Sequence, residues 1–364
     1  MKMMKKYEAD TTNPAKSNPF TLSFGNKPFE YVSRDREFRS LIERINSEPP
    51  LSHCFVITGV RGSGKTVALT TIKDHFEKEN DWIVIELNPE DDMREGLAAK
   101  LYSEAHIKHI FLEKDFSFSF QGISFSIHGK NPVLNIDDLL DKMIKAIAKQ
   151  GKRILVAVDE ATNNQYMKRF ALSFQILIRN NYPLFLLTTS LYENISSLEN
   201  EKNMTFLIRA PKLFLTPLSL QAMTASYEST LNMTFAEALK CAKMTKGYAF
   251  AFQLLGYLLF EKSQKELNQR LMVTFDQYLE EYVYTKVWST LTNVERNIVK
   301  SFNTNNSVSI STILERTGMK KEYFSRYRDR LIKKGILISL ERGKLSFALP
   351  RFNEFIEIET AYLD

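Results

Sequence analysis

The chain has 364 residues, of which 44% are hydrophobic and 25% charged, and its formal net charge is +6. This length exceeds the size at which one hydrophobic core usually stops growing, so we expect two or three domains. Two cysteines without metal-ligand spacing exclude a disulfide framework and fit a reducing compartment. The most apolar run, 249–260, is too short to cross a bilayer. We therefore expect a cytoplasmic protein with no membrane role.

The first elements in chain order are an arm, a helix and a buried strand. Residues 1–30 are polar and rich in turn-forming residues, which predicts an N-terminal arm. Apolar residues at helical spacing begin just after Arg34. The apolar run 54–58 ends at Gly59 and predicts a buried strand, and residues 66–79 are expected to follow it as a helix.

Further short apolar runs alternate with helical patterns along the next part of the chain. The runs predict strands at 82–87, 153–158, 184–189 and 212–215. Helices are expected at 136–149 and 166–180. Alternating strands and helices predict an α/β fold, with a parallel sheet covered by helices on both faces. We assign this sheet to a nucleotide-binding core at residues 31–216.

One segment interrupts this alternation. Residues 116–120 and 123–127 alternate Phe or Ile with Ser on either side of Gln121-Gly122. Period-2 alternation around a Gly-containing turn predicts a β-hairpin insertion at about 115–128. We expect it to pack on the core or on another subunit, and we assign it no chemistry.

After Pro217 the pattern becomes helical, which predicts an all-α unit, or lid, at residues 217–288. The last unit, 289–364, shows three short helical patterns followed by two short strand patterns. The helices are expected at 294–302, 310–317 and 320–333, and the strands at 337–340 and 345–349. This order resembles a winged helix-turn-helix.

A phosphate-binding loop lies between the first predicted strand and the helix after it. The residues 59–66 match the P-loop pattern Gly-x-x-x-x-Gly-Lys-Thr in full. Its glycines let backbone N–H groups surround phosphate oxygens, Lys65 reaches the β- and γ-phosphates, and the Thr66 hydroxyl binds Mg²⁺. We therefore expect ATP or ADP with Mg²⁺ as ligands. The predicted nucleotide contacts are Gly59, Val60, Arg61, Gly62, Ser63, Gly64, Lys65, Thr66 and Val67.

A hydrolytic site also needs acidic residues at the end of a second buried strand. Asp159 and Glu160 follow the apolar run 153–158. Asp159 is expected to act on Mg²⁺, and Glu160 to polarise the attacking water as a general base, which predicts an ATPase. Thr188 or Thr189, at the end of another strand, can orient the water or read the γ-phosphate. Small hydroxyl residues also end strands for packing reasons, so both readings stay open.

The order of these features resembles the AAA+ ATPases. Within them it is most similar to the branch containing origin-recognition initiator ATPases and their bacterial relatives, with STAND-type signalling ATPases close by. The resemblance implies that Arg34 lies beside the adenine, with Ser33 replacing the usual glycine. It also implies that Arg209 reaches the γ-phosphate of a neighbouring subunit as an arginine finger, although an exposed arginine can serve solvation alone.

The predicted lid departs from both families. Initiator-like members carry a nucleotide-sensing arginine near Phe250, and STAND members carry a proline at the position of Ala249. This chain has neither. We expect Phe250, Phe252, Leu254 and Leu255 to pack the lid.

The C-terminal unit carries a local excess of positive charge. Between residues 291 and 351 there are thirteen basic and five acidic residues, an excess of eight against a net charge of +6 for the whole chain. A third helix with an apolar stripe and a basic outer stripe fits a recognition helix, and basic residues around Gly343 fit a wing that meets phosphates. The predicted DNA contacts are Lys321, Ser325, Arg326, Arg330, Lys333, Arg342 and Lys344.

The sequence thus predicts an ATP-dependent AAA+ protein that binds double-stranded DNA through its C-terminal winged helix, alone or as a homo-oligomer. The alternative is a STAND-like nucleotide switch in signalling or defence, in which the winged helix packs on the core or on a protein partner. A third possibility is a helper ATPase for DNA transposition.

Overall fold

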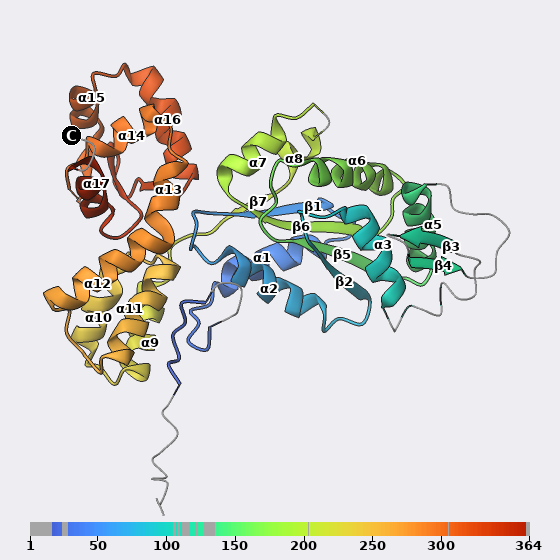
Figure 1. Cartoon of the computed structure of the whole chain (residues 1–364), viewed down its shortest axis with the longest axis horizontal. Helices are drawn as coiled ribbons and strands as arrows, with labels where there is room; N and C mark the ends of the chain where they lie inside the picture. Colours follow the sequence, from blue (N-terminus) through green and yellow to red (C-terminus); the bar gives the residue numbers. More distant parts are fainter. Residues whose placement is uncertain are drawn as a thin grey trace, which may run out of the picture.

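The computed structural model describes residues 17–23, 28–104, 107, 110, 117–120, 123–126, 135–202, 204–304 and 306–361. Figure 1 shows an α/β part on one side and two helical groups on the other. In the described residues, no helix is long and apolar enough to cross a membrane.

The α/β part is built on a five-stranded parallel sheet in the order β2-β5-β6-β1-β7. The strands are β1 (Cys54–Thr58), β2 (Trp82–Leu87), β5 (Arg153–Val158), β6 (Leu184–Ser190) and β7 (Lys212–Phe214). The predicted parallel sheet is therefore confirmed, with strand ends that differ from the predicted ones by at most one residue. Because β6 lies between β1 and β5, the carboxyl ends of these three strands meet at one edge of the sheet.

Helices cover both faces of this sheet, which explains why its strands are apolar throughout. On one face Phe55 and Ile57 of β1 pack with α1 (Asp35–Ile45) and α2 (Lys65–Phe76). On the other face Cys54 and Val56 pack with a second helical layer. That layer contains α3 (Met93–Ser103), α5 (Ile136–Ala148), α6 (Gln165–Arg179), α7 (Tyr192–Glu199) and α8 (Thr205–Arg209).

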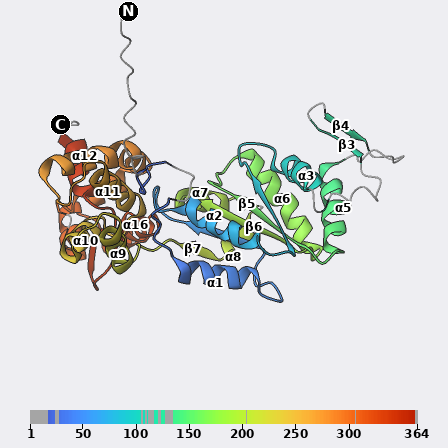
Figure 2. The same ribbon diagram turned by 90° about the horizontal axis from the view of Figure 1, so that it is seen from below.

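The predicted hairpin insertion is present as two short antiparallel strands. They are β3 (Ser117–Phe120) and β4 (Ile123–Ser126), and Phe118 pairs with Phe125 in their register. The two turn residues between them lie outside the described residues. Figure 2 shows the hairpin at the end of the molecule that carries α5, opposite the C-terminal helices.

The first helical group, which we call the lid, runs from α9 to α13. Its elements are α9 (Leu220–Thr230), α10 (Phe235–Met244), α11 (Ala249–Glu261), α12 (Gln269–Leu279), a π-helical turn (Glu280–Tyr284) and α13 (Thr285–Ser289). Side-chain caps begin three of the helices: Ser219 before α9, Thr234 before α10 and Asn268 before α12. These caps satisfy backbone N–H groups that the first helical turn leaves unbonded.

The second group, the C-terminal unit, combines four helices with a three-stranded antiparallel sheet in the order β8-β10-β9. Its elements are α14 (Asn293–Lys300), β8 (Val308–Ser309), α15 (Ile310–Thr317), α16 (Lys321–Lys333), β9 (Leu337–Ile338), β10 (Lys344–Phe347) and α17 (Phe352–Ala361). The three helices and two strands expected from the sequence are present, and β8 and α17 were not predicted.

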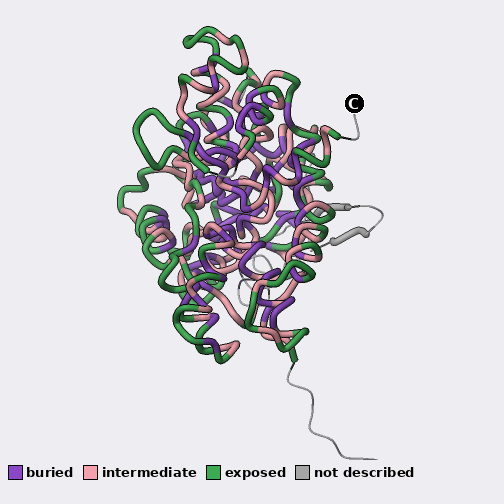
Figure 3. Tube along the Cα trace, turned by 90° about the vertical axis from the view of Figure 1, so that its left-hand side faces the viewer, coloured by how far each residue is buried: buried purple, intermediate pink, exposed green. Residues whose placement is uncertain are grey.

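The lid and the C-terminal unit share one continuous hydrophobic core. It extends from Tyr227 and Phe252 in the lid to Phe347 and Phe352 in the C-terminal unit. Figure 3 views this end of the molecule and shows buried segments running through its middle with exposed segments outside. Buried Cys241 belongs to this core and buried Cys54 to the sheet, so both cysteines fill apolar interiors.

Candidate nucleotide-binding site

The loop between β1 and α2 turns where its glycines permit it. Gly62 and Gly64 have φ values of +75° and +93°, in the left-handed region that favours glycine. A Cβ on Gly62 would also meet the Tyr248 hydroxyl at 2.3 Å. The helix α2 begins at Lys65, so its unbonded N-terminal N–H groups face the inside of the loop. This is the geometry that a phosphate group requires.

Lys65 is buried, with 7% of its surface exposed, and its ammonium group is turned toward the loop. Its Nζ donates to the carbonyl oxygens of Gly59 (3.2 Å) and Val60 (3.1 Å). Burial lowers the pKa of Lys65 to about 8, although the nearby carboxylates of Glu160 and Asp159 oppose this shift. A phosphate in the loop would supply the negative charge that favours the protonated ammonium group.

Asp159 lies between two hydroxyl groups at the carboxyl edge of the sheet. The Thr66 hydroxyl donates to Oδ2 of Asp159 over 2.8 Å, and the Thr189 hydroxyl donates to Oδ1. The backbone N–H of Glu160 donates to the Thr189 hydroxyl over 2.8 Å. The structure therefore brings Thr66, Asp159, Glu160 and Thr189 together, whereas the Thr188 hydroxyl donates to the backbone of its neighbour.

Glu160 is exposed and lines the pocket next to the loop. Its φ of 54° is unusual for a residue with a side chain, because the left-handed region costs about 1–2 kcal/mol outside glycine. The hydrogen bond from its N–H to Thr189 helps to hold this conformation. Glu160 thus lies just after the end of β5, in the wall of the pocket that the phosphate-loop residues also line.

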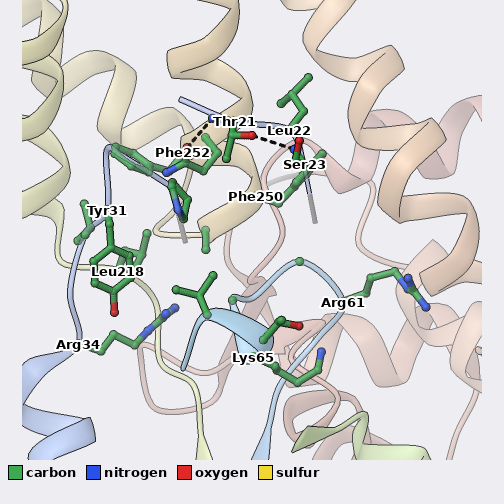
Figure 4. A pocket seen from close by; sticks show the side chains of 18 of the residues that line it. Thr21, Leu22, Ser23, Tyr31, Arg34, Arg61, Lys65, Leu218, Phe250 and Phe252 are labelled. Atoms are coloured by element: carbon green, nitrogen blue, oxygen red, sulfur yellow. Dashed lines mark hydrogen bonds between the residues drawn. The ribbon is translucent and has the colours of Figure 1, made fainter. Parts of the chain in front are cut away.

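A pocket extends from the phosphate loop to the lid (Figure 4). Lys65 lies at one end of it, and Thr21, Leu22 and Ser23 of the N-terminal segment lie at the other. Thr66 also lines it. Apolar side chains from the lid and the inter-element loops complete its walls: Val32, Leu218, Ala249, Phe250 and Phe252. Val67, one of the predicted contacts, also lines this pocket.

Arg34 also lines the pocket, although its guanidinium group is held by the protein itself. Its Nη2 donates to the carbonyl of Ser63 over 3.1 Å, and its Nε donates to the carbonyl of Thr216 over 3.0 Å. Burial lowers the pKa of the Arg34 side chain, and Glu37 at 4.0 Å opposes this effect. Arg34 thus joins the phosphate loop to the segment that follows β7.

The start of α11 contacts the phosphate loop directly, which the sequence did not reveal. The Tyr248 hydroxyl donates to the carbonyl of Arg61, and the N–H of Phe250 donates to the carbonyl of Gly62 over 3.0 Å. Tyr248 is buried, and burial raises its pKa well above the usual range. The lid therefore holds the loop through the Tyr248 hydroxyl and the backbone of Phe250.

The residues at the strand ends also suit a magnesium ion. A hydroxyl from Thr66 and a carboxylate from Asp159 are the oxygen ligands that Mg²⁺ prefers, and Mg²⁺ usually keeps several waters and binds substrate phosphates. In the described part of the chain, no group of three or more His, Cys, Asp or Glu side chains could hold a metal by itself. The donors present fit a metal that arrives with a nucleotide.

Two predicted sets of residues lie away from this pocket. Arg209 ends α8 on the exposed surface, just before β7 begins at Lys212. Strand β7 is parallel to β1, and Lys212 pairs with Val56. Because the loop follows the carboxyl end of β1, Arg209 lies toward the opposite, amino-terminal end of these strands. The predicted DNA contacts lie in the C-terminal unit. All are exposed except Ser325, which is half-buried: Lys321, Arg326, Arg330, Lys333, Arg342 and Lys344.

Comparisons with known proteins agree with this geometry. Residues 34–165 match the KAP family P-loop domain, and residues 281–356 match a domain of unknown function, DUF8462. The ORC2 protein of Aeropyrum pernix, in its ADPNP-ADP complexes, has 14% identity and a TM-score of 0.50, covering 91% of this chain and 94% of that one. The chain carries a P-loop NTPase domain with the AAA+ fold.

Other similarities are more distant. The Cdc6p structure from Pyrobaculum aerophilum is 12% identical to this chain, with a TM-score of 0.46 and coverage of 94% of this chain and 96% of that one. No curated protein matches the sequence. Nucleotide binding by this chain is thus supported by its phosphate loop and by the matched P-loop family.

Proposed function

We propose that this AAA+ protein binds and hydrolyses ATP in the pocket beside the phosphate loop. The arrangement of Thr66, Asp159, Glu160 and Thr189 at adjoining strand ends supports this proposal most strongly. The loop N–H groups and Lys65 would bind the phosphates, and the nucleoside would occupy the apolar end of the pocket. Mg²⁺, held by Thr66 and Asp159, would neutralise charge that develops on the phosphates.

Glu160 has the position of the general base in this proposal. Its carboxylate lies at the pocket wall near Lys65, as the electrostatic effect of Glu160 on that lysine indicates. The Thr189 hydroxyl links Asp159 to the backbone of Glu160, so the metal-binding carboxylate and the base are positioned together. Substitution of Lys65 by Ala should abolish ATP binding, and retained affinity would contradict the assignment of this pocket.

We also propose that Arg209 completes the site of a neighbouring subunit. The side chain is exposed and makes no hydrogen bond or ion pair with the described residues. It also lies away from the phosphate loop of its own chain. If Arg209 acts between subunits, turnover per subunit should rise with protein concentration, and Arg209→Ala should remove the rise. If turnover per subunit does not change with protein concentration, the site is complete within one chain and the proposed role of Arg209 is wrong.

The C-terminal unit is proposed to be a winged helix that binds double-stranded DNA. On α16, Phe324 and Leu331 face the core while Arg326 and Arg330 are exposed. Arg342 and Lys344 flank Gly343, where the chain turns between β9 and β10. Exposed cations on a helix and at a hairpin tip can meet phosphates along one duplex. We also propose that the chain is divided into four parts: an arm (1–30), the nucleotide-binding core (31–216), the lid (217–288) and the winged helix (289–364).

The double variant Arg326→Ala/Arg330→Ala tests DNA binding. It should weaken duplex binding and reduce the slope of log affinity against log salt by roughly 2, because each phosphate contact contributes about one unit. The matched control is Arg169→Ala/Arg179→Ala, which removes two exposed arginines from α6 of the α/β part. Unchanged affinity and slope in the α16 variant would refute the DNA assignment.

A second candidate is a nucleotide switch whose C-terminal unit packs on the nucleotide-binding core. Two contacts favour it. Gly335, just after α16, lies against the loop residue Val60, where an added Cβ would come within 3.3 Å of the Val60 Cβ. The Lys333 ammonium also lies 5.8 Å from the ring centre of Tyr192 in α7. A switch should show no DNA binding in any nucleotide state, together with hydrogen exchange at residues 332–336 that differs between ATP and ADP.

A further inference from the structure

An N-terminal strap, residues 17–23 and 28–34, joins the lid to the phosphate loop. Phe20 anchors it and is 1% exposed. The Phe20 ring lies 5.8 Å from the ring centres of both Tyr227 and Phe252, against Gly256 of α11. A Cβ on Gly256 would come within 2.5 Å of the Phe20 ring. The lid thus contains a socket for this one aromatic side chain, and the socket exists because residue 256 is glycine.

A single amide side chain holds the two halves of the strap. Oε1 of Gln253 accepts the backbone N–H of Thr21 over 3.1 Å. Nε2 of Gln253 donates to the carbonyl of Glu30 over 2.6 Å. The Ser226 hydroxyl donates to the carboxylate of Glu30 over 2.6 Å. Because both polar ends of Gln253 bond to strap backbone, the lid fixes the strap by shape and by hydrogen bonds together.

The other end of the strap is fixed to the phosphate loop. Arg34 donates to the carbonyl of Ser63, and Gly64 lies next to the same guanidinium group. Between these anchors the strap residues Thr21, Leu22 and Ser23 line the pocket on the side opposite Lys65 (Figure 4). Since the phosphates belong at Lys65, the base and ribose of a nucleotide belong under the strap.

We propose that the strap is the base-side wall of the ATP pocket, and that Phe20 is a positioning residue that sets affinity for the nucleoside part of the ligand. This inference rests on the proposed ATP site and assigns its second half. The phosphate loop would recognise any triphosphate, whereas the strap would recognise only a ligand that carries a base. Seating Phe20 in the lid would also link occupancy of the base end to the position of the lid.

The sharpest variant is Gly256→Ala. Alanine is a better helix former than glycine, so α11 should stay folded while the added methyl group forces the Phe20 ring out of its socket. Phe20→Ala removes the anchor directly, and the double variant should bind ATP no worse than Phe20→Ala alone. The matched control is Phe29→Ala, because Phe29 is on the same strap but 89% exposed.

The measurement is the affinity of the full-length protein for ATP and for inorganic tripolyphosphate, by calorimetry, with folding checked by circular dichroism. We expect Gly256→Ala and Phe20→Ala to weaken ATP binding by about tenfold, a change equivalent to roughly 1.4 kcal/mol. Tripolyphosphate affinity should stay unchanged in both variants, and Phe29→Ala should match the wild type for both ligands.

Two results would overturn the strap proposal while leaving the ATP site in place. One is wild-type ATP affinity in both Gly256→Ala and Phe20→Ala. The other is an equal loss of ATP and tripolyphosphate binding, which would mean that the substitutions disturb the phosphate loop rather than the base end. A wild-type protein that binds neither ligand would instead refute the ATP site itself, and the strap proposal with it.

Discussion

Asp159 is held by two threonine hydroxyls, from the start of α2 and the end of β6. One of these hydroxyls also accepts the N–H of Glu160, whose backbone is in the left-handed region. The neighbouring carboxylates therefore have different surroundings: Asp159 is hydrogen-bonded at both oxygens, and Glu160 is exposed to the pocket. This difference suits metal binding by Asp159 and proton transfer by Glu160.

Glu160→Gln should separate binding from chemistry. The amide keeps the size of the side chain but cannot accept a proton from water, so ATP turnover should fall by at least about 100-fold. ATP affinity should persist, because the phosphate contacts are unchanged. Glu193→Gln is a suitable control, since Glu193 also acts electrostatically on Lys65 but lies in α7. Equal turnover in Glu160→Gln and wild type would exclude Glu160 as the base.

The buried ammonium of Lys65 predicts a pH dependence of ATP binding. Burial depresses its pKa to about 8 in the free protein, and a bound phosphate favours the protonated form. Above pH 8, binding must therefore take up a proton, and ATP affinity should fall by up to about tenfold per pH unit. Calorimetry at pH 9 in buffers of different ionisation enthalpy should show uptake approaching one proton.

Lys65→Arg is the control for this linkage, because arginine stays protonated throughout this range. If the variant still binds ATP, its binding should take up no proton at pH 9. Proton uptake of the same size in Lys65→Arg would show that another group titrates.

Among the elements, α14 and α16 are joined by a buried ion pair. The Lys334 ammonium, just after α16, lies 3.1 Å from the carboxylate of Glu295 in α14, and Glu295 is fully buried. Glu295→Ala leaves that ammonium buried without its carboxylate, so unfolding free energy should fall by roughly 3 kcal/mol or more. Urea unfolding measures the change.

Glu341→Ala is the control, because it breaks an exposed ion pair with Lys344 and should lower the unfolding free energy by at most about 0.5 kcal/mol. Similar losses in the two variants would contradict the difference in burial.

The elements also show which parts of the fold can be predicted from sequence. The strands β2 and β5 were predicted to the residue, because fully buried apolar runs between turns leave little choice. The two-residue strand β8 was missed, since Val308 and Ser309 have no local pattern and pair only through β10. Local sequence encodes burial, whereas pairing across the chain is visible only in the folded protein.

The residues of the candidate site likewise include some that the sequence predicts and others that only the folded structure shows. The loop residues and Asp159 follow from motifs with a fixed spacing. The contacts of Tyr248 and Phe20 do not, because each depends on an approach between segments more than 180 residues apart. The Asn18-Pro19-Phe20 segment was assigned only to a polar arm, because nothing in the sequence distinguishes Phe20, which is buried, from Phe29 of the same arm, which is exposed.

In the whole molecule, the phosphate loop contacts the strap, the lid and the C-terminal unit. The strap reaches it through Arg34, the lid through Tyr248 and the C-terminal unit through Gly335. The lid and the C-terminal unit share one hydrophobic core, so movement of one should carry the other. A nucleotide that alters these contacts would thus act on the exposed cations of α16.

Nucleotide bound at the phosphate loop should therefore change the affinity of α16 for DNA. This prediction is tested by the affinity of the full-length protein for a fluorescent DNA duplex at fixed salt, with ATP, with ADP and without nucleotide. We predict that the three affinities differ and that Lys65→Ala shows one affinity in all three conditions. Identical affinities for the wild-type protein in the three conditions, or no DNA binding in any of them, would contradict coupling between the nucleotide site and α16.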